Sequence, residues 1–208
     1  MLYNVNNKLK RNKYEIMIRK LSKKFVGFIA KDNYTVEEIE EMEYVLNTIL
    51  FEVIKLTSTI VIFSILGYFI ESLIIISIMS ITKPFIGGYH EDTQLKCFIA
   101  TMLLTTGILI LSLQTSFTFL SNCIAIIMCI FCIYNQAPVI NPKMPITRPH
   151  LIQKNRVKGL CNVIFLGIVS IMLYKYSSYY LLITWTIIFQ TILMFNKMEK
   201  NGKNNLRR

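Results

Sequence analysis

The sequence predicts an all-α integral membrane protein with about six transmembrane helices, preceded by an amphipathic helix at the membrane interface. Its 208 residues are 53% hydrophobic and only 17% charged, which is too apolar for a soluble domain of this size. Several nearly uncharged runs approach the ~20 residues that a spanning helix needs. The net charge of +11 collects in alternating segments, as expected for the cytoplasmic parts of a multi-pass protein.

The N-terminal segment, residues 1–35, is expected to form an amphipathic helix with a basic face on the cytoplasmic side. Its apolar stripe consists of Tyr14, Met17, Ile18, Leu21, Phe25, Phe28 and Ile29. Most of its lysines lie off that stripe. The helix either lies on the anionic inner leaflet or receives a partner helix, or it packs on the protein's own cytoplasmic side. No signal peptide is expected, since a continuous apolar core is missing.

Residues 36–195 form the predicted membrane bundle. Four spans are predicted at Cys97–Ser112, Phe117–Tyr134, Cys161–Tyr174 and Tyr179–Phe195. The stretch Tyr44–Ile86 is long enough for two shorter spans that meet near Gly67–Glu71. Thr35 and Glu38 have the spacing of a capping box, so a helix is predicted to start there. The acidic residues that follow, Glu37 to Glu43, either pair with neighbouring lysines or are solvated.

Glu52 and Lys55 are three residues apart, which places them on one helix face. They are expected to form a structural ion pair, and the alternative is a role in transport.

Prolines define a cytoplasmic loop at 135–159, because each removes a backbone donor and restricts the preceding residue. Nine Lys/Arg lie within residues 1–31, five within 143–158 and five in the tail 196–208. The positive-inside rule therefore places both termini and this loop in the cytoplasm of a cell-membrane protein. The basic end of the loop either only sets topology or also binds substrate. Nucleic acid is not an expected partner, because no soluble scaffold presents the charge.

Four of the five cysteines lie inside predicted spans and are interpreted as small hydrophobic residues: Cys123, Cys129, Cys132 and Cys161. Cys129-x-x-Cys132 has redox spacing, but an apolar helix offers no electropositive setting for a reactive thiol. No metal site and no cofactor are expected.

Cys97 differs, because it stands at the start of a span beside Lys96 and seven residues after His90, one of two histidines. A membrane-surface histidine can take the proton of a nucleophilic thiol. On a straight helix the two groups would be about 10 Å apart, too far for a hydrogen bond of roughly 3 Å. The catalytic segment 84–97, which contains Pro84, Gly87 and Gly88, must therefore bend. From the residues alone, the alternative is a histidine and a cysteine that never meet.

The run Gly87-Gly88-Tyr89-His90, followed by Cys97, resembles the accessory gene regulator protein B (AgrB) family, membrane peptidases of Gram-positive quorum sensing. The basic N-terminus, the length, the apolar spans and the Ala137-Pro138 loop with Asn141-Pro142 are also similar, so the likeness covers essentially the whole chain. One departure is Lys83, where the family usually has an arginine.

The resemblance implies a cysteine endopeptidase with catalytic His90 and Cys97, supported by Gly87, Gly88 and Lys83. It would remove the acidic C-terminal tail of an AgrD-like autoinducing-peptide precursor through a Cys97 acyl-enzyme and promote thiolactone cyclisation. The family also implies a homodimer. The alternatives are a small transporter or peptide exporter using Glu52, Lys55 and Glu71, and a non-catalytic membrane adaptor.

Overall fold

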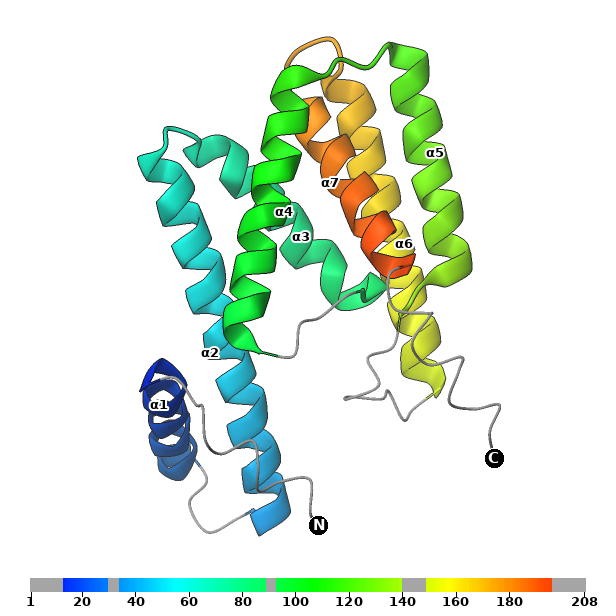
Figure 1. Cartoon of the computed structure of the whole chain (residues 1–208). Helices are drawn as coiled ribbons and strands as arrows, with labels where there is room; N and C mark the ends of the chain where they lie inside the picture. The colour runs from blue at the N-terminus through cyan, green and yellow to red at the C-terminus, as the bar shows by residue number, and fades with distance from the viewer. Residues whose placement is uncertain (1–12, 30–33, 89–92, 140–148, 196–208) are drawn as a thin grey trace, which may run out of the picture. The chain divides into compact units, whose positions relative to one another are not determined.

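The chain folds into helices throughout the part that the structure, a computed structural model, describes: residues 13–29, 34–88, 93–139 and 149–195. The helices are α1 (Lys13–Ile29), α2 (Val36–Ile65), α3 (Phe69–Ile86), α4 (Gln94–Gln114), α5 (Phe119–Gln136), α6 (Pro149–Leu173) and α7 (Tyr179–Phe195) (Figure 1). Contacts divide the chain into two compact units, Met1–Ser58 and Thr59–Arg208. The all-helical prediction is confirmed.

Helix α1, in the first unit, buries one edge of its predicted apolar stripe together with residues beside that edge. Ile18, Ser22 and Val26 are buried, whereas three members of the predicted apolar stripe are exposed, and these are Leu21, Phe25 and Phe28. Spacings of three and four residues place these three side chains along one ridge. The expected apolar stripe therefore divides into a packed edge and an exposed ridge.

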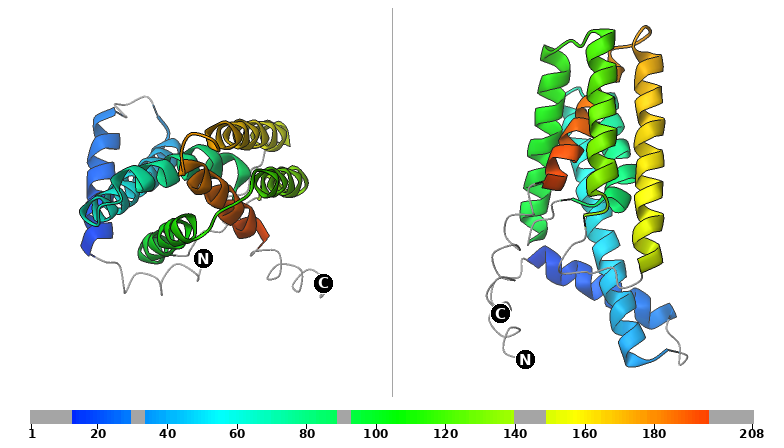
Figure 2. Two further views of the ribbon diagram at one scale, coloured as in Figure 1. Left: turned by 90° about the horizontal axis from the view of Figure 1, so that it is seen from above. Right: turned by 90° about the vertical axis from the view of Figure 1, so that its right-hand side faces the viewer.

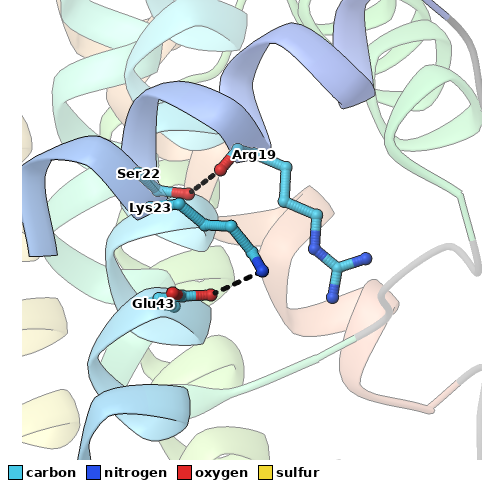
Figure 3. A network of polar contacts seen from close by, with 4 residues as sticks. All are labelled: Arg19, Ser22, Lys23 and Glu43. Atoms are coloured by element: carbon cyan, nitrogen blue, oxygen red, sulfur yellow. Dashed lines mark hydrogen bonds and ion pairs between the residues drawn. The ribbon is translucent and has the colours of Figure 1, made fainter. Parts of the chain in front are cut away.

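One ion pair within the first unit joins α1 to α2: Lys23 Nζ lies 3.7 Å from Glu43 Oε2 (Figure 3). Within α1 itself, the Ser22 hydroxyl donates to the Arg19 carbonyl at 3.0 Å. At least one residue of the acidic run thus pairs with a neighbouring lysine. The ion pair is largely exposed on its lysine side, so its contribution to stability is small.

The predicted capping box opens α2. The Thr35 backbone N–H donates to Glu38 Oε2 at 2.8 Å, and the Glu38 N–H donates to Thr35 Oγ1 at 3.3 Å. Further along the same helix, Lys55 Nζ lies 2.5 Å from Glu52 Oε2, which confirms the expected ion pair. The acidic turns and the first apolar span form one continuous helix of 30 residues.

The helix break predicted near Gly67 is present, since α2 ends at Ile65 and α3 begins at Phe69. Gly67 has φ +87, a conformation that favours glycine. Five helices, α2 to α6, are long and apolar enough to cross a membrane, and α7 is a shorter apolar helix. Together they correspond to the six predicted spans of a multi-pass membrane protein.

Helix α7 lies at the centre of the second unit, where it packs against α3, α4, α5 and α6 (Figures 1 and 2). Most of its side chains are buried, and one hydrophobic cluster joins it to α3, α5 and α6 through Ile78, Ile133 and Val163. A helix that is apolar on all sides is expected in such a position. The ends of α3, α5 and α7 and the starts of α4 and α6 lie together, and we call this the site end.

Three buried polar side chains connect the outer helices to α7. Asn122 Nδ2 donates to Ser170 Oγ at 3.3 Å, and Thr184 Oγ1 donates to Asn122 Oδ1 at 2.7 Å. The hydroxyls of Ser170 and Thr184 lie 2.8 Å apart. All three side chains are fully buried. Because no water reaches them inside the apolar bundle, these polar groups bond to one another instead.

The loop predicted at 135–159 is shorter than expected. Helix α5 continues to Gln136, and α6 already begins at Pro149. Proline is tolerated in the first turn of a helix, where its missing N–H would have no partner. Residues 150–159, which contain no further proline, therefore belong to α6. Residues 140–148, 1–12 and the tail 196–208 lie outside the described part of the chain.

Candidate active site

The predicted bend in segment 84–97 begins at Gly87. Pro84 lies inside the last turn of α3, and the helix stops after Ile86, with the Gly87 N–H donating to the Lys83 carbonyl at 3.0 Å. Gly87 and Gly88 have φ values of +76 and +129, which residues with a side chain rarely adopt. The glycines, and not the proline, therefore end the helix.

Gly87 also passes too close to another backbone for any side chain. It forms an isolated parallel bridge with Val139, whose N–H donates to the Ile86 carbonyl at 3.0 Å. A Cβ added at Gly87 would lie 2.2 Å from the Val139 carbonyl oxygen. The loop after α5 thus fixes the turn after α3, and only glycine fits between them.

Gly88 brings the same turn to the end of α7. It is buried, and a Cβ placed there would lie 3.9 Å from the Leu193 carbonyl oxygen. On the other side, a Cβ at Gly159 of α6 would lie 2.8 Å from Ile86 Cγ2. The glycine turn is therefore held by α6, by α7 and by the loop after α5.

Cys97 lies in the first turn of α4. Thr93 caps this helix by accepting from the Lys96 N–H at 3.3 Å, and the Cys97 N–H donates to the Thr93 carbonyl at 3.0 Å. The three residues before Cys97 are exposed, but Cys97 itself is only 9% exposed. Thr101 and Thr105 follow it at intervals of four and are also buried. Cys97 is thus the first side chain of α4 that faces the bundle.

The start of α4 is a favourable place for an anionic group. The first N–H groups of a helix and its dipole both favour negative charge. Of the other four cysteines, Cys129, Cys132 and Cys161 lie well inside α5 and α6, whereas Cys123 follows the first turn of α5. His90 lies outside the described residues, as do Tyr89, Glu91 and Asp92. The expected approach of His90 to Cys97 therefore stays a prediction, and four residues join Gly88 to Thr93.

Basic side chains of α6 cover the site end beside the glycine turn. Lys158 Nζ lies 5.5 Å from the centre of the Phe85 ring, and the Arg156 guanidinium lies 4.8 Å from that of Tyr134. Arg156 also donates to the Tyr134 carbonyl at 2.5 Å. Lys154 is exposed. These residues belong to the basic end of the predicted loop; Lys158 lies beside the end of α3, and Arg156 lies beside the end of α5.

Comparison with known proteins agrees with this arrangement. The family model described as Accessory gene regulator B matches residues 22–194. The chain belongs to the AgrB family. It is also 45% identical over 184 residues to a protein of Clostridium perfringens (strain 13 / Type A) named as AgrB-like protein 1, covering 88% of this chain and 98% of that protein. No solved structure matches.

Membership of the AgrB family implies, by family, the role of a cysteine endopeptidase that processes AgrD. Within the described residues no cluster of three or more His, Cys, Asp or Glu side chains could hold a metal ion. Lys83 is half-buried in the last turn of α3. It therefore lies next to the glycine turn but several residues before the catalytic candidates.

One polar residue at the site end of this AgrB-family chain has no counterpart in the sequence prediction. Gln190 of α7 is 4% exposed and lies within hydrogen-bond distance of Thr82 of α3, which is fully buried. The available signal was a single glutamine within the apolar run Tyr179–Phe195. It was missed because periodicity alone does not show which face of a uniformly apolar helix meets which neighbour.

Proposed function

We propose that this protein is a membrane cysteine endopeptidase that removes the C-terminal tail of an AgrD-like precursor, with Cys97 as nucleophile and His90 as base. The observation that carries the proposal is the position of Cys97, which is buried in the first turn of α4 and is preceded by the glycine turn. The helix start favours the anionic thiolate that attacks. Family membership supplies the substrate class.

The proposed reaction has two acyl transfers. His90 takes the proton from the Cys97 thiol, and the sulfur attacks the carbonyl carbon of the peptide bond before the tail. The C–N bond breaks, the amine of the tail leaves with the proton from His90, and a thioester forms on Cys97. A precursor thiol then attacks the thioester carbonyl, releasing Cys97 and closing a thiolactone. Exclusion of water at the membrane interface favours ring closure over hydrolysis.

The basic surface of α6 supports the choice of an acidic tail. Lys158 lies beside the end of α3, and the exposed Lys154 precedes it by four residues on α6; their charge would hold an acidic tail near the glycine turn. We further propose that this end, with both termini, faces the cytoplasm, because the basic segments require it. The exposed ridge of α1, flanked by Lys20 and Lys24, would then lie on the anionic inner leaflet.

The test is co-expression of a tailed precursor with four variants, reading tail release on gels. Cys97→Ala and His90→Ala should abolish release. Cys161→Ala and His150→Ala, which change an exposed cysteine and the other histidine of the chain, should retain it. Tail release by both Cys97→Ala and His90→Ala would refute the peptidase function and favour the alternative of a transporter. A precursor thioester trapped on Cys97 would exclude a non-catalytic adaptor.

A further inference from the structure

Gln190 is the buried polar group at the site end that the packing does not satisfy. It is 4% exposed on the central helix α7, and its Nε2 has no hydrogen-bond partner in the described part of the chain. Inside a membrane bundle such a group is costly, because neither water nor lipid replaces the missing bond. Because a buried amide with an unbonded nitrogen lowers stability, stability alone does not explain the presence of Gln190 here.

Thr82 shows that one end of this amide stays open in either orientation. The Thr82 hydroxyl has a single hydrogen to donate. Its oxygen lies 2.7 Å from the Ile78 carbonyl oxygen and also beside Gln190 Oε1. If the hydrogen goes to Gln190, the amide nitrogen lacks a partner. If it goes to Ile78, the amide must turn to donate to Thr82, and then its oxygen lacks one. Thr82 thus holds one end of the amide and leaves the other available.

The position of Gln190 relates it to the glycine turn. Leu193, whose carbonyl oxygen lies nearest to Gly88, follows Gln190 by three residues, or about 4.5 Å along the helix axis. Gln190 is therefore about one turn deeper in the bundle than the point at which Gly88 crosses α7. Thr82 lies on α3, whose end leads into the same turn. Two helices thus present this amide just inside the turn that precedes the catalytic candidates.

We propose that Gln190 is a peptide-binding residue, whose open amide end hydrogen-bonds to the backbone of the precursor next to the bond that is cut. A carboxamide suits a peptide group, because it can donate to a carbonyl or accept from an N–H. Bound precursor would supply the hydrogen bond that this amide lacks within the described part of the chain. The inference depends on the proposed peptidase function and names a residue that positions its substrate.

The test measures tail release and thermal stability of the purified full chain in lipid nanodiscs, using a tailed precursor peptide. Gln190→Met removes the amide but keeps a similar volume. KM should rise roughly three- to tenfold, the effect of one lost hydrogen bond, while kcat changes less than twofold. The melting temperature should stay equal or rise, since no unsatisfied amide is buried. Thr82→Val, which removes the group that orients the amide, should raise KM in the same direction but less.

Asn122→Leu is the matched control, because it removes a fully buried amide whose two ends are both bonded. It should lower the melting temperature and leave KM unchanged. The inference is overturned if Gln190→Met keeps the wild-type KM, or if it melts lower like Asn122→Leu, which would make Gln190 structural. Absence of tail release by the wild-type protein would instead refute the proposed function itself.

Discussion

At the scale of single residues, the glycine turn shows how closely the backbone limits the candidate site. Gly87 must be glycine for two reasons: its φ is positive, and the Val139 carbonyl approaches it closely. Gly88 must be glycine only because of its positive φ, since the nearest atom would be 3.9 Å from an added Cβ. Two adjacent glycines therefore have different physical reasons, although the sequence presents them as one run.

This difference predicts a graded effect of alanine substitution. Gly87→Ala should abolish tail release, because a Cβ at 2.2 Å forces the Val139 loop away from the turn. Gly88→Ala should reduce release by a smaller factor, because only backbone strain of about 1–3 kcal/mol opposes it. Gly107→Ala is the control, since its Cβ would make an ordinary contact at 3.7 Å and its φ is not positive. Equal activity of the Gly87 and Gly88 variants would contradict this account.

At the scale of helices, the sequence predicted starts and breaks better than contacts. The capping box at Thr35 and the turn at Gly67 depend on local hydrogen bonds and φ values, which nearby residues determine. The extent of the loop before α6 was wrong, because Pro149 fits a helix start as well as a loop. The sequence left open how α1 packs, since an apolar stripe does not show which of its edges meets a neighbour.

The exposed ridge of α1 predicts insertion into lipid. The chain has one tryptophan, Trp185, so Trp185→Phe with Phe28→Trp creates a single probe on the ridge. Its fluorescence should be quenched by brominated lipids in anionic bilayers, because the ridge lies in the interface. In the same background, Arg19→Trp places the probe on an exposed position well away from the ridge and should escape quenching. Equal quenching at the two positions would show that α1 does not lie on the membrane by this ridge.

The basic start of α6 predicts a charge-dependent step. Lys154→Gln should raise KM for a precursor with an acidic tail by a few-fold, and added salt should reduce the difference by screening. The same substitution should leave KM unchanged for a precursor with a neutral tail. Arg156→Gln, in contrast, is expected to lower the melting temperature, because Arg156 donates to the Tyr134 carbonyl. A salt-independent effect of Lys154→Gln would point to packing instead of charge.

At the scale of the whole molecule, the predicted number of spans is confirmed, but their arrangement was not predictable. The run Tyr179–Phe195 is apolar on most of its surface, and its few polar residues, such as Gln190, do not show which helices surround it. The arrangement depends on long-range pairs such as Thr184 with Asn122 and Trp185 with Thr115. The meeting of His90 and Cys97 is likewise a long-range question that spacing alone only constrains.

The central place of α7 predicts that its polar bonds hold the bundle together. Thr184→Val removes bonds to Asn122 and Ser170 while keeping the shape of the side chain. The free energy of unfolding in lipid or mild detergent should fall by about 1–2 kcal/mol, the upper range for such bonds between membrane helices. Thr106→Val is a suitable control, because the Thr106 hydroxyl bonds only to the Met102 carbonyl of its own helix. Equal losses for both variants would refute a linking role.

Among the described helices, α7 is both the central one of its unit and the last along the chain. Helices α3 to α6 leave the ribosome before α7, so Asn122 and Ser170 can already bond to each other, whereas Thr82 must wait for Gln190. The glycine turn waits as well, because Gly88 lies against Leu193, near the end of α7. A chain truncated before α7 would thus retain Cys97 but lack the helix against which Gly88 lies, so we expect such a chain to leave a tailed precursor uncut.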